Sequence, residues 1–287
     1  MPGGSQGSAQ VSAKAESHIR IGIGGWTYAP WRGVFYPSDL AHKRELEYAS
    51  RKLTSIEVNG TYYGSQKPDT FAKWHDETPE DFIFALKAPR FATARRVLAD
   101  AGPSIERFFA SGVMALREKL GPINWQMPPT KAFDPVDFAA FLKLLPQRVA
   151  GQSIRHAVEL RHDTFRTAEA VALAREHGVA IVLAGDASYP QIADLTAPFV
   201  YARIMGTTEA EPLGYADNDL DRWVECARLL RSGTVPADLA TVGKSTAARA
   251  SRDVFLYVIS GFKIQNPAAA TAMIRRLDQA DGGGHTR

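Results

Sequence analysis

The chain has 287 residues, 45% of them hydrophobic and 23% charged, with one cysteine and a formal net charge of +3. A single cysteine excludes an internal disulfide, and so small a charge excess does not by itself indicate a nucleic-acid binder. Length alone permits either two domains or one α/β barrel of about 250 residues.

Both ends of the chain have the composition of unstructured segments. Residues 1–18 are rich in Gly, Ser and Ala and contain no apolar run of the kind that a secretory signal needs, so we interpret them as a disordered leader. Residues 281–287 are predicted to be a disordered tail. No run of eighteen apolar residues is present to span a membrane. We therefore expect a cytoplasmic protein with one folded domain over residues 19–280.

Short β-rich runs alternate with amphipathic stretches throughout this domain. The strand candidates are residues 19–25, 55–60, 82–89, 122–129, 156–162, 180–185, 199–206 and 253–261. Helical periodicity lies between most of them, for example at residues 105–120, 138–145 and 220–230, and only the sixth candidate lacks a clear following helix. This order predicts a single (β/α)8 barrel of the TIM type, with parallel strands and a polar C-terminal mouth.

An open, doubly wound sheet is the alternative fold. Its dinucleotide fingerprint needs three glycines at the opening of a helix. Gly22 and Gly24 match the first two, but Thr27 occupies the third position and no helical pattern follows. The barrel is therefore favoured.

Five aromatic residues follow the first strand in a loop that also contains glycine and proline. They are Trp26, Tyr28, Trp31, Phe35 and Tyr36. Glycine allows the backbone to turn sharply after the strand, so we expect the first three rings to form one wall of the barrel mouth. For the last two, packing in the core is the favoured interpretation.

Polar residues recur near the C-terminal ends of the strands, where the active sites of such barrels lie. These residues are Glu57, Asn59, Lys87, Gln126, Glu159, Arg161, Asp186 and Arg203. Strand alternation turns Glu57, Asn59, Glu159 and Arg161 toward the barrel axis. The charged residues either neutralise one another as internal salt bridges or line a cavity that binds a polar ligand. The number of contributing strands favours the cavity.

The residue types at this end allow more than one chemistry. Glu57, Glu159 and Asp186 are candidates for general acid and base, or for ligands of a divalent metal such as Mg²⁺ or Mn²⁺. Lys87 is a further catalytic candidate, and Arg161 and Arg203 suit a phosphate or carboxylate. The sequence contains no P-loop, no G-x-S-x-G, no H-E-x-x-H and no motif for an organic cofactor.

Two further residues with reactive side chains have structural interpretations. His162 should face away from the barrel axis, so it is expected to pack or to cap a helix. Cys226 lies in a helical pattern and is expected to be a packed thiol.

Several segments, in this order, resemble the DUF72 family, also called YecE-like proteins. They are IGIGGWTYAPWRGVFYP, SIEVNGTYYGSQKPDTFAKWHDETPEDFIFALKAPR, NWQMPP, VELRHDTF and FVYARIMGT. The resemblance covers about residues 19 to 280 and implies a TIM-like barrel. Its matching positions add Tyr62 and Trp74 to the residues above, together with Tyr201. It implies no particular activity, and barrels of the sugar-phosphate isomerase and endonuclease IV types are analogies only.

We carry two hypotheses about function from the sequence. The first is an enzyme that acts at the barrel mouth on a phosphorylated or other anionic substrate, by phosphodiester hydrolysis or sugar-phosphate chemistry. The second is a non-catalytic protein that binds nucleic acid or a small anion, with Trp26, Tyr28 and Tyr62 among the contact residues. A membrane is not an expected partner, and the oligomeric state is left open.

Overall fold

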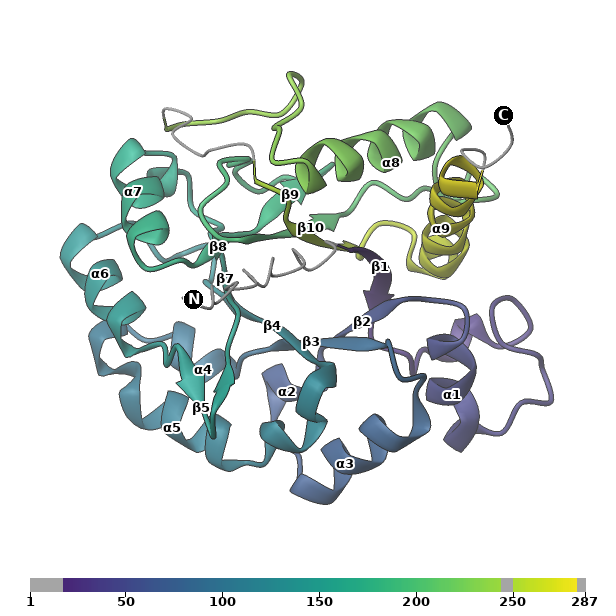
Figure 1. Ribbon diagram of the computed structural model, residues 1–287, viewed down its shortest axis with the longest axis horizontal. Coiled ribbons are helices and arrows are strands. Elements are labelled where there is room, and N and C mark those ends of the chain that lie inside the picture. The colour runs from purple at the N-terminus through teal and green to yellow at the C-terminus, as the bar shows by residue number, and fades with distance from the viewer. Residues whose placement is uncertain (1–17, 244–249, 283–287) are drawn as a thin grey trace, which may run out of the picture.

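The computed structural model describes residues 18–243 and 250–282 (Figure 1). The predicted leader, apart from His18, lies outside the described residues, as does the predicted tail beyond Gly282. The first two residues of that predicted tail belong instead to the last helix, α9 (Asn266–Gly282). Among the described helices, none combines the length and the apolar character needed to cross a membrane.

Parallel strands form the centre of the molecule, in agreement with the predicted barrel (Figure 1). They are β1 (Ile19–Gly24), β2 (Ser55–Val58), β3 (Ile83–Lys87), β4 (Leu120–Gln126), β7 (His156–Glu159), β8 (Ala180–Ile181), β9 (Leu183–Gly185), β10 (Phe199–Ile204) and β11 (Asp253–Val258). Every predicted strand is present, and each lies within two residues of its expected start.

The sheet closes through β8 and β9, which are two parts of the predicted sixth strand. Only Val182 separates them, and its N–H donates to the carbonyl of Val158 in β7 over 2.9 Å. On one side β8 pairs with β7, and on the other β9 pairs with β10. The order of the nine parallel strands therefore returns to its start, and the fold is a TIM barrel.

Strand alternation divides the apolar residues between two cores. Ala85, Ala157, Tyr201, Phe255 and Tyr257 belong to the core inside the barrel. The residues of opposite parity form the larger core between the strands and the outer helices. Because the pleat reverses direction at every residue, the parity that points inward also carries the polar residues at the strand ends.

Helices cover the outside of the barrel (Figure 1). They are α1 (Glu45–Ser50), α2 (Gly60–Tyr63), α3 (Pro68–Glu77), α4 (Arg90–Thr93), α5 (Gly102–Ala110), α6 (Pro135–Leu144), α7 (Ala168–Glu176), α8 (Asp217–Arg231) and α9. A short hairpin, β5 (Arg148–Val149) and β6 (Gln152–Ser153), precedes β7. No helix lies in residues 186–198 after β9, as expected for the sixth strand.

The continuous helix predicted over residues 105–120 is wrong. The α-helix α5 ends at Ala110, and Gly112 adopts φ +101°, which breaks the helical path. A 3-10 segment, Val113–Lys119, follows, and Arg117 within it also has a positive φ of 49°. The apolar periodicity continues across this break because both segments pack against the same strands.

Candidate functional site at the barrel mouth

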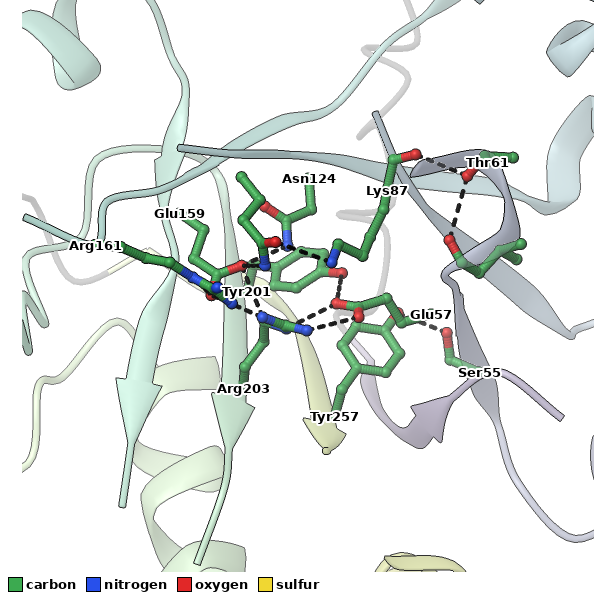
Figure 2. A network of polar contacts seen from close by, with 12 residues as sticks. Ser55, Glu57, Thr61, Lys87, Asn124, Glu159, Arg161, Tyr201, Arg203 and Tyr257 are labelled. Carbon is green, nitrogen blue, oxygen red and sulfur yellow. Dashed lines mark hydrogen bonds and ion pairs between the residues drawn. The ribbon is translucent and has the colours of Figure 1, made fainter. Parts of the chain in front are cut away.

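A network of buried polar side chains fills the C-terminal end of the barrel (Figure 2). We call it the mouth cluster. Its members are Glu57, Lys87, Asn124, Gln126, Glu159, Arg161, Tyr201 and Arg203. They come from β2, β3, β4, β10 and the end of β7, and their parity turns each one inward. The structure therefore brings together six of the polar residues predicted from strand ends.

Arg203 lies between the two carboxylates and forms an ion pair with each. Its Nη2 donates to Glu57 Oε1 over 3.0 Å, and its Nε lies 3.0 Å from Glu57 Oε2. Its Nη1 lies 2.7 Å from each carboxylate oxygen of Glu159. Since all three side chains are almost fully buried, each charge depends on the others for its compensation. The structure thus supports the salt-bridge interpretation for these three residues.

Glu159 has more hydrogen-bond and ion-pair partners than Glu57. Besides Arg203, it accepts hydrogen bonds from Arg161 Nε over 2.8 Å, from Gln126 Nε2 over 2.7 Å and from Asn124 Nδ2 over 3.2 Å. Burial acts to raise the pKa of Glu159, but the charges of Arg203 and Arg161 outweigh it and lower that pKa to about 2. Glu159 is therefore a permanent anion, unsuited to act as a general acid or base at neutral pH.

Glu57 holds a tyrosine as well as Arg203. The hydroxyl of Tyr201 donates to Glu57 Oε2 over 2.7 Å. Burial, together with the charge of Glu57, raises the pKa of Tyr201 well above its ordinary value, so this phenol stays protonated as a donor. With Arg203 and Tyr201 bound, both oxygens of Glu57 have partners.

Lys87 differs from the other charged members. Its Nζ donates to the neutral amide oxygen of Gln126 over 3.1 Å and lies 4.2 Å from the centre of the Tyr62 ring. No carboxylate lies within ion-pair distance of it in the parts of the chain that the structure describes. Burial lowers the pKa of Lys87 to about 8, although the nearby charge of Glu57 opposes that shift.

Arg161 forms the outer edge of the cluster. Its Nη2 lies 2.7 Å from Glu159 Oε1, and its guanidinium lies over the ring of Tyr189, 4.2 Å from the centroid. Its side chain is 16% exposed, compared with 5% for Arg203, so Arg161 is the arginine that a ligand at the mouth could reach. Tyr62, over which Lys87 lies, is also partly exposed.

Two predicted site residues lie at the same end of the barrel but outside this network. Asn59 follows β2, and its amide nitrogen lies close to Gly24. Asp186 follows β9 with a positive φ of 50°, which turns its side chain toward α8. There it accepts a hydrogen bond from Trp223 Nε1 over 2.8 Å, and Arg222 lies 4.0 Å away.

The geometry does not favour Glu57, Glu159 and Asp186 as a set of metal ligands. The two glutamates are bridged by Arg203, and the contacts of Asp186 are on α8. Within residues 18–243 and 250–282, no three His, Cys, Asp or Glu side chains are arranged to hold a metal ion. A divalent cation would need to displace Arg203 to bind between the carboxylates.

The first three rings of the aromatic loop after β1 do not form one wall, because Trp31 is buried and Trp26 packs on α3. Trp31 is 1% exposed and donates its Nε1–H to the carbonyl of Lys263, so its predicted place at the mouth is wrong. Trp26 packs edge-on against Trp74 of α3, on the outer side of the barrel. Tyr28 packs against Trp31, with Lys263 Nζ 4.1 Å above its ring. Gly25, with φ +74°, directs the chain outward at this point.

Tyr36, expected in the core, is 1% exposed, and its hydroxyl donates to the carbonyl of Trp26. Cys226 is buried as expected, and burial raises the pKa of its thiol to about 12, so it remains unreactive. His162 caps the short 3-10 helix Asp163–Phe165, because its ring accepts a hydrogen bond from Thr164 N–H.

Comparison with known proteins identifies the family. The family described as "Protein of unknown function DUF72" matches residues 20–285. The chain belongs to the DUF72 family. The expected resemblance is confirmed, and with it the TIM-barrel fold.

Relatives of this DUF72 protein carry names without an activity. It is similar to the UPF0759 protein YecE of Escherichia coli (strain K12), with 27% identity over 150 residues, which are 51% of this chain and 50% of that protein. The match thus spans about half the length of that curated relative. It is also similar to UPF0759 protein YunF of Bacillus subtilis (strain 168), with 28% identity over 39% of this chain and 40% of YunF.

Among solved structures, a DUF72 family protein from Thermotoga maritima MSB8 superimposes with a TM-score of 0.69. The two share 23% identity, and the match covers 91% of this chain and 99% of that one. Similarity at this level establishes the fold, so any function must be argued from the mouth cluster itself.

Proposed function

We propose that the barrel mouth binds a small phosphorylated or otherwise anionic molecule and that Lys87 exchanges a proton with it. The isolation of the Lys87 ammonium carries this proposal. Two carboxylates and three basic side chains meet in the mouth cluster, and Arg203 and Arg161 account for both carboxylates. Lys87 is therefore the excess positive charge, and an anionic ligand is the partner that its buried position lacks.

In this proposal Glu57 and Glu159 are positioning residues. Glu159 fixes Arg161 at the rim and orients Gln126, whose oxygen in turn holds the Lys87 ammonium. Glu57 holds Arg203 and Tyr201 below them. This differs from the acid and base roles expected from the sequence, because both carboxylates are committed to cationic partners.

Lys87 has the properties of a general acid or base. With a pKa of about 8, it is mostly ammonium near neutral pH but keeps a substantial minority of amine, so it can give or take a proton there. Arg161 binds Glu159 through Nε and Nη2, so the remaining N–H groups of its guanidinium are those that can donate to a phosphate or carboxylate. Proton transfer on a phosphorylated sugar fits these groups better than metal-assisted hydrolysis, because Arg203 occupies the space between the carboxylates.

The test is the binding of a simple dianion, sulfate, measured by calorimetry at neutral pH. Lys87→Met and Arg161→Met should each weaken binding about tenfold or more, because each removes a charged hydrogen-bond donor. Lys143→Met is the matched control, since Lys143 is an exposed lysine on α6. Equal affinity in all four proteins, with unchanged circular dichroism, would contradict the proposal.

A second candidate, the binding of single-stranded nucleic acid, has one observation in its favour. Tyr63 is 71% exposed and Phe91 is 47% exposed, on the short helices that follow β2 and β3. Arg90 and Arg96, from the segment that contains Phe91, form no ion pair within the described residues. Exposed rings beside free arginines suit stacked bases and phosphates.

A double variant, Tyr63→Ala with Phe91→Ala, distinguishes the two functions. If the protein binds a thymidine oligonucleotide by stacking, the variant loses affinity for it while sulfate binding at the mouth is unchanged. Salt sensitivity provides the second criterion, because phosphate contacts make affinity fall steeply with ionic strength. An oligonucleotide affinity that is the same in the parent and the double variant would contradict this candidate.

A further inference from the structure

We propose a second ligand site, a carbohydrate-binding pocket on the outer wall of the barrel between α1 and α3. The pocket has a volume of about 400 Å³, within the range of small-molecule sites. Trp26 and Trp74 form its aromatic surface, and Lys43, Asp69, Lys73 and Glu77 surround them. None of these residues belongs to the mouth cluster, so the site is independent of the proposed function.

The two indoles are held rigidly by the core beneath them. Trp26 and Trp74 meet edge to face, with centroids 5.1 Å apart. Trp74 packs in the same way on the buried ring of Phe71, 5.2 Å away, and Trp26 contacts Phe84 at 6.4 Å. Because Phe71 and Phe84 are fully buried, both tryptophans present a preorganised surface that loses little entropy when a ligand binds.

The pocket tryptophans differ from the others in their N–H groups. The chain has five tryptophans, and Trp31, Trp125 and Trp223 each donate Nε1–H to a protein acceptor. Trp26 and Trp74 donate to no acceptor among the described residues. Their indole nitrogens are not among the fully buried polar atoms that lack a partner, so both nitrogens are at least partly exposed. Neither N–H group has an acceptor among these residues, so each has a donor left for a ligand.

The charges around the pocket balance. Lys43 and Lys73 oppose Asp69 and Glu77, and Lys73 Nζ lies 3.6 Å from Glu77 Oε1. The Asp69 carboxylate makes neither an ion pair nor a hydrogen bond with any other described residue. Such a site has no net attraction for an anion, but it offers strong acceptors and donors to a neutral ligand.

A sugar has the chemistry that matches this arrangement. One face of a pyranose ring presents C–H groups that can pack on an indole, and its edge carries hydroxyls that both donate and accept. The free indole N–H groups can donate to ring or hydroxyl oxygens, and Asp69 can accept from hydroxyls. A phosphate or sulfate is an anion and has no apolar face, so it fits the mouth rather than this pocket.

The experiment is fluorine NMR of the full chain labelled with 5-fluorotryptophan. Trp26→Phe and Trp74→Phe assign the two pocket resonances, and maltose, cellobiose and N-acetylglucosamine are the probes. At least one sugar should shift these two resonances saturably, with a Kd on the order of 1 mM, while the Trp125 resonance does not move. Asp69→Asn should weaken that binding severalfold, and Lys87→Met should leave it unchanged.

Two results would overturn the inference. One is the absence of a saturable shift with all three sugars at concentrations about ten times that Kd. The other is a shift that sulfate or glycine produces as strongly as the sugars, since this would indicate a charged ligand. Asp69→Asn is a surface change of one atom, so its effect can be measured in a folded protein.

Discussion

Raising the pH should weaken the binding of sulfate at the barrel mouth, and Lys87 should be the cause. Burial lowers the pKa of this ammonium to about 8. Sulfate remains a dianion above neutral pH, so its own charge does not change. Burial raises the pKa of Tyr62, the ring beneath Lys87, so this phenol does not lose its proton near that pH.

The size of the effect follows from the fraction of Lys87 that is protonated. At about pH 7, roughly 90% of a group with this pKa carries its proton, and at about pH 9.5 only about 3% does. If sulfate binds the ammonium form alone, the apparent affinity falls in proportion, about 30-fold over this range. The sulfate affinity is nearly constant well below the pKa of Lys87 and falls above it, because sulfate binds the protonated form of Lys87.

The assay is calorimetric titration with sulfate at constant ionic strength across this pH range. Lys87→Met should bind weakly and show no slope, while Lys143→Met should reproduce the parent curve. Lys87→Arg should bind sulfate without loss of affinity at high pH, because a guanidinium that fits the site keeps its charge there. A parent curve that is flat, or a Lys87→Met curve with the same slope as the parent, would refute the assignment.

Three further predictions concern stability. Arg203→Met should lower the free energy of unfolding by about 3–5 kcal/mol in urea denaturation, because it leaves two buried carboxylates without their shared cation. Glu159→Gln should reduce the loss of stability in acid. The pKa of Glu159 in the folded protein, about 2, lies below its ordinary value of 4.5, so this carboxylate stabilises the fold at pH values above 4.5. That contribution is lost as the pH falls through about 2. The measurement is the unfolding midpoint over that window, and equal acid sensitivity in both proteins would contradict it. Gly22→Ala should lower the free energy of unfolding by at least about 3 kcal/mol, since the new Cβ would lie 1.9 Å from the backbone oxygen of Ser55, whereas Gly64→Ala, which meets open space, should have little effect on the thermal midpoint.

The barrel could be predicted from the sequence because each strand carries a local signal. Apolar and β-branched runs stand at regular intervals, and alternation fixes which residues point inward. Residues 180–185 were identifiable as a strand even though they form two short paired segments. The kink after α5 was not predictable from periodicity, because apolar spacing continues through Gly112 while its backbone leaves the helical region.

The membership of the mouth cluster was partly predictable, and its pairing was not. Parity placed Glu57 and Glu159 inside the barrel, but the sequence does not say that one arginine would bridge them. Asn124 was missed, although it lies two residues before Gln126 on the same face of β4. Asp186 lies at the same end of the barrel but its contacts are on α8, and the sequence gives no local sign of its positive φ.

The side-chain directions in the loop after β1 could not be predicted, for a different physical reason. Glycines and prolines remove the periodicity by which a side chain's direction is predicted, so five aromatic residues could be counted but not oriented. Trp31 and Tyr36 turned inward to the core, and Trp26 turned to the outer helices. Aromatic content alone indicates packing as readily as binding, and the contacts of Trp31 and Tyr36 are those of packing.

The composition of the mouth cluster argues for a ligand beyond the contacts that the chain itself provides. A buried ion network contributes little net stability compared with apolar side chains of similar size, because each charge must first be removed from water. A layer needed only to fill the upper barrel would be more stable if it were apolar, as the layer around Ala157 and Phe255 largely is. Arg203 and Arg161 together balance the two carboxylates, yet the cluster also contains Lys87, whose pKa is lowered by burial and which no carboxylate pairs with among the described residues. The cost of that one uncompensated cation is what an anionic ligand would remove, so Lys87 is the residue at which structure and function should be tested first.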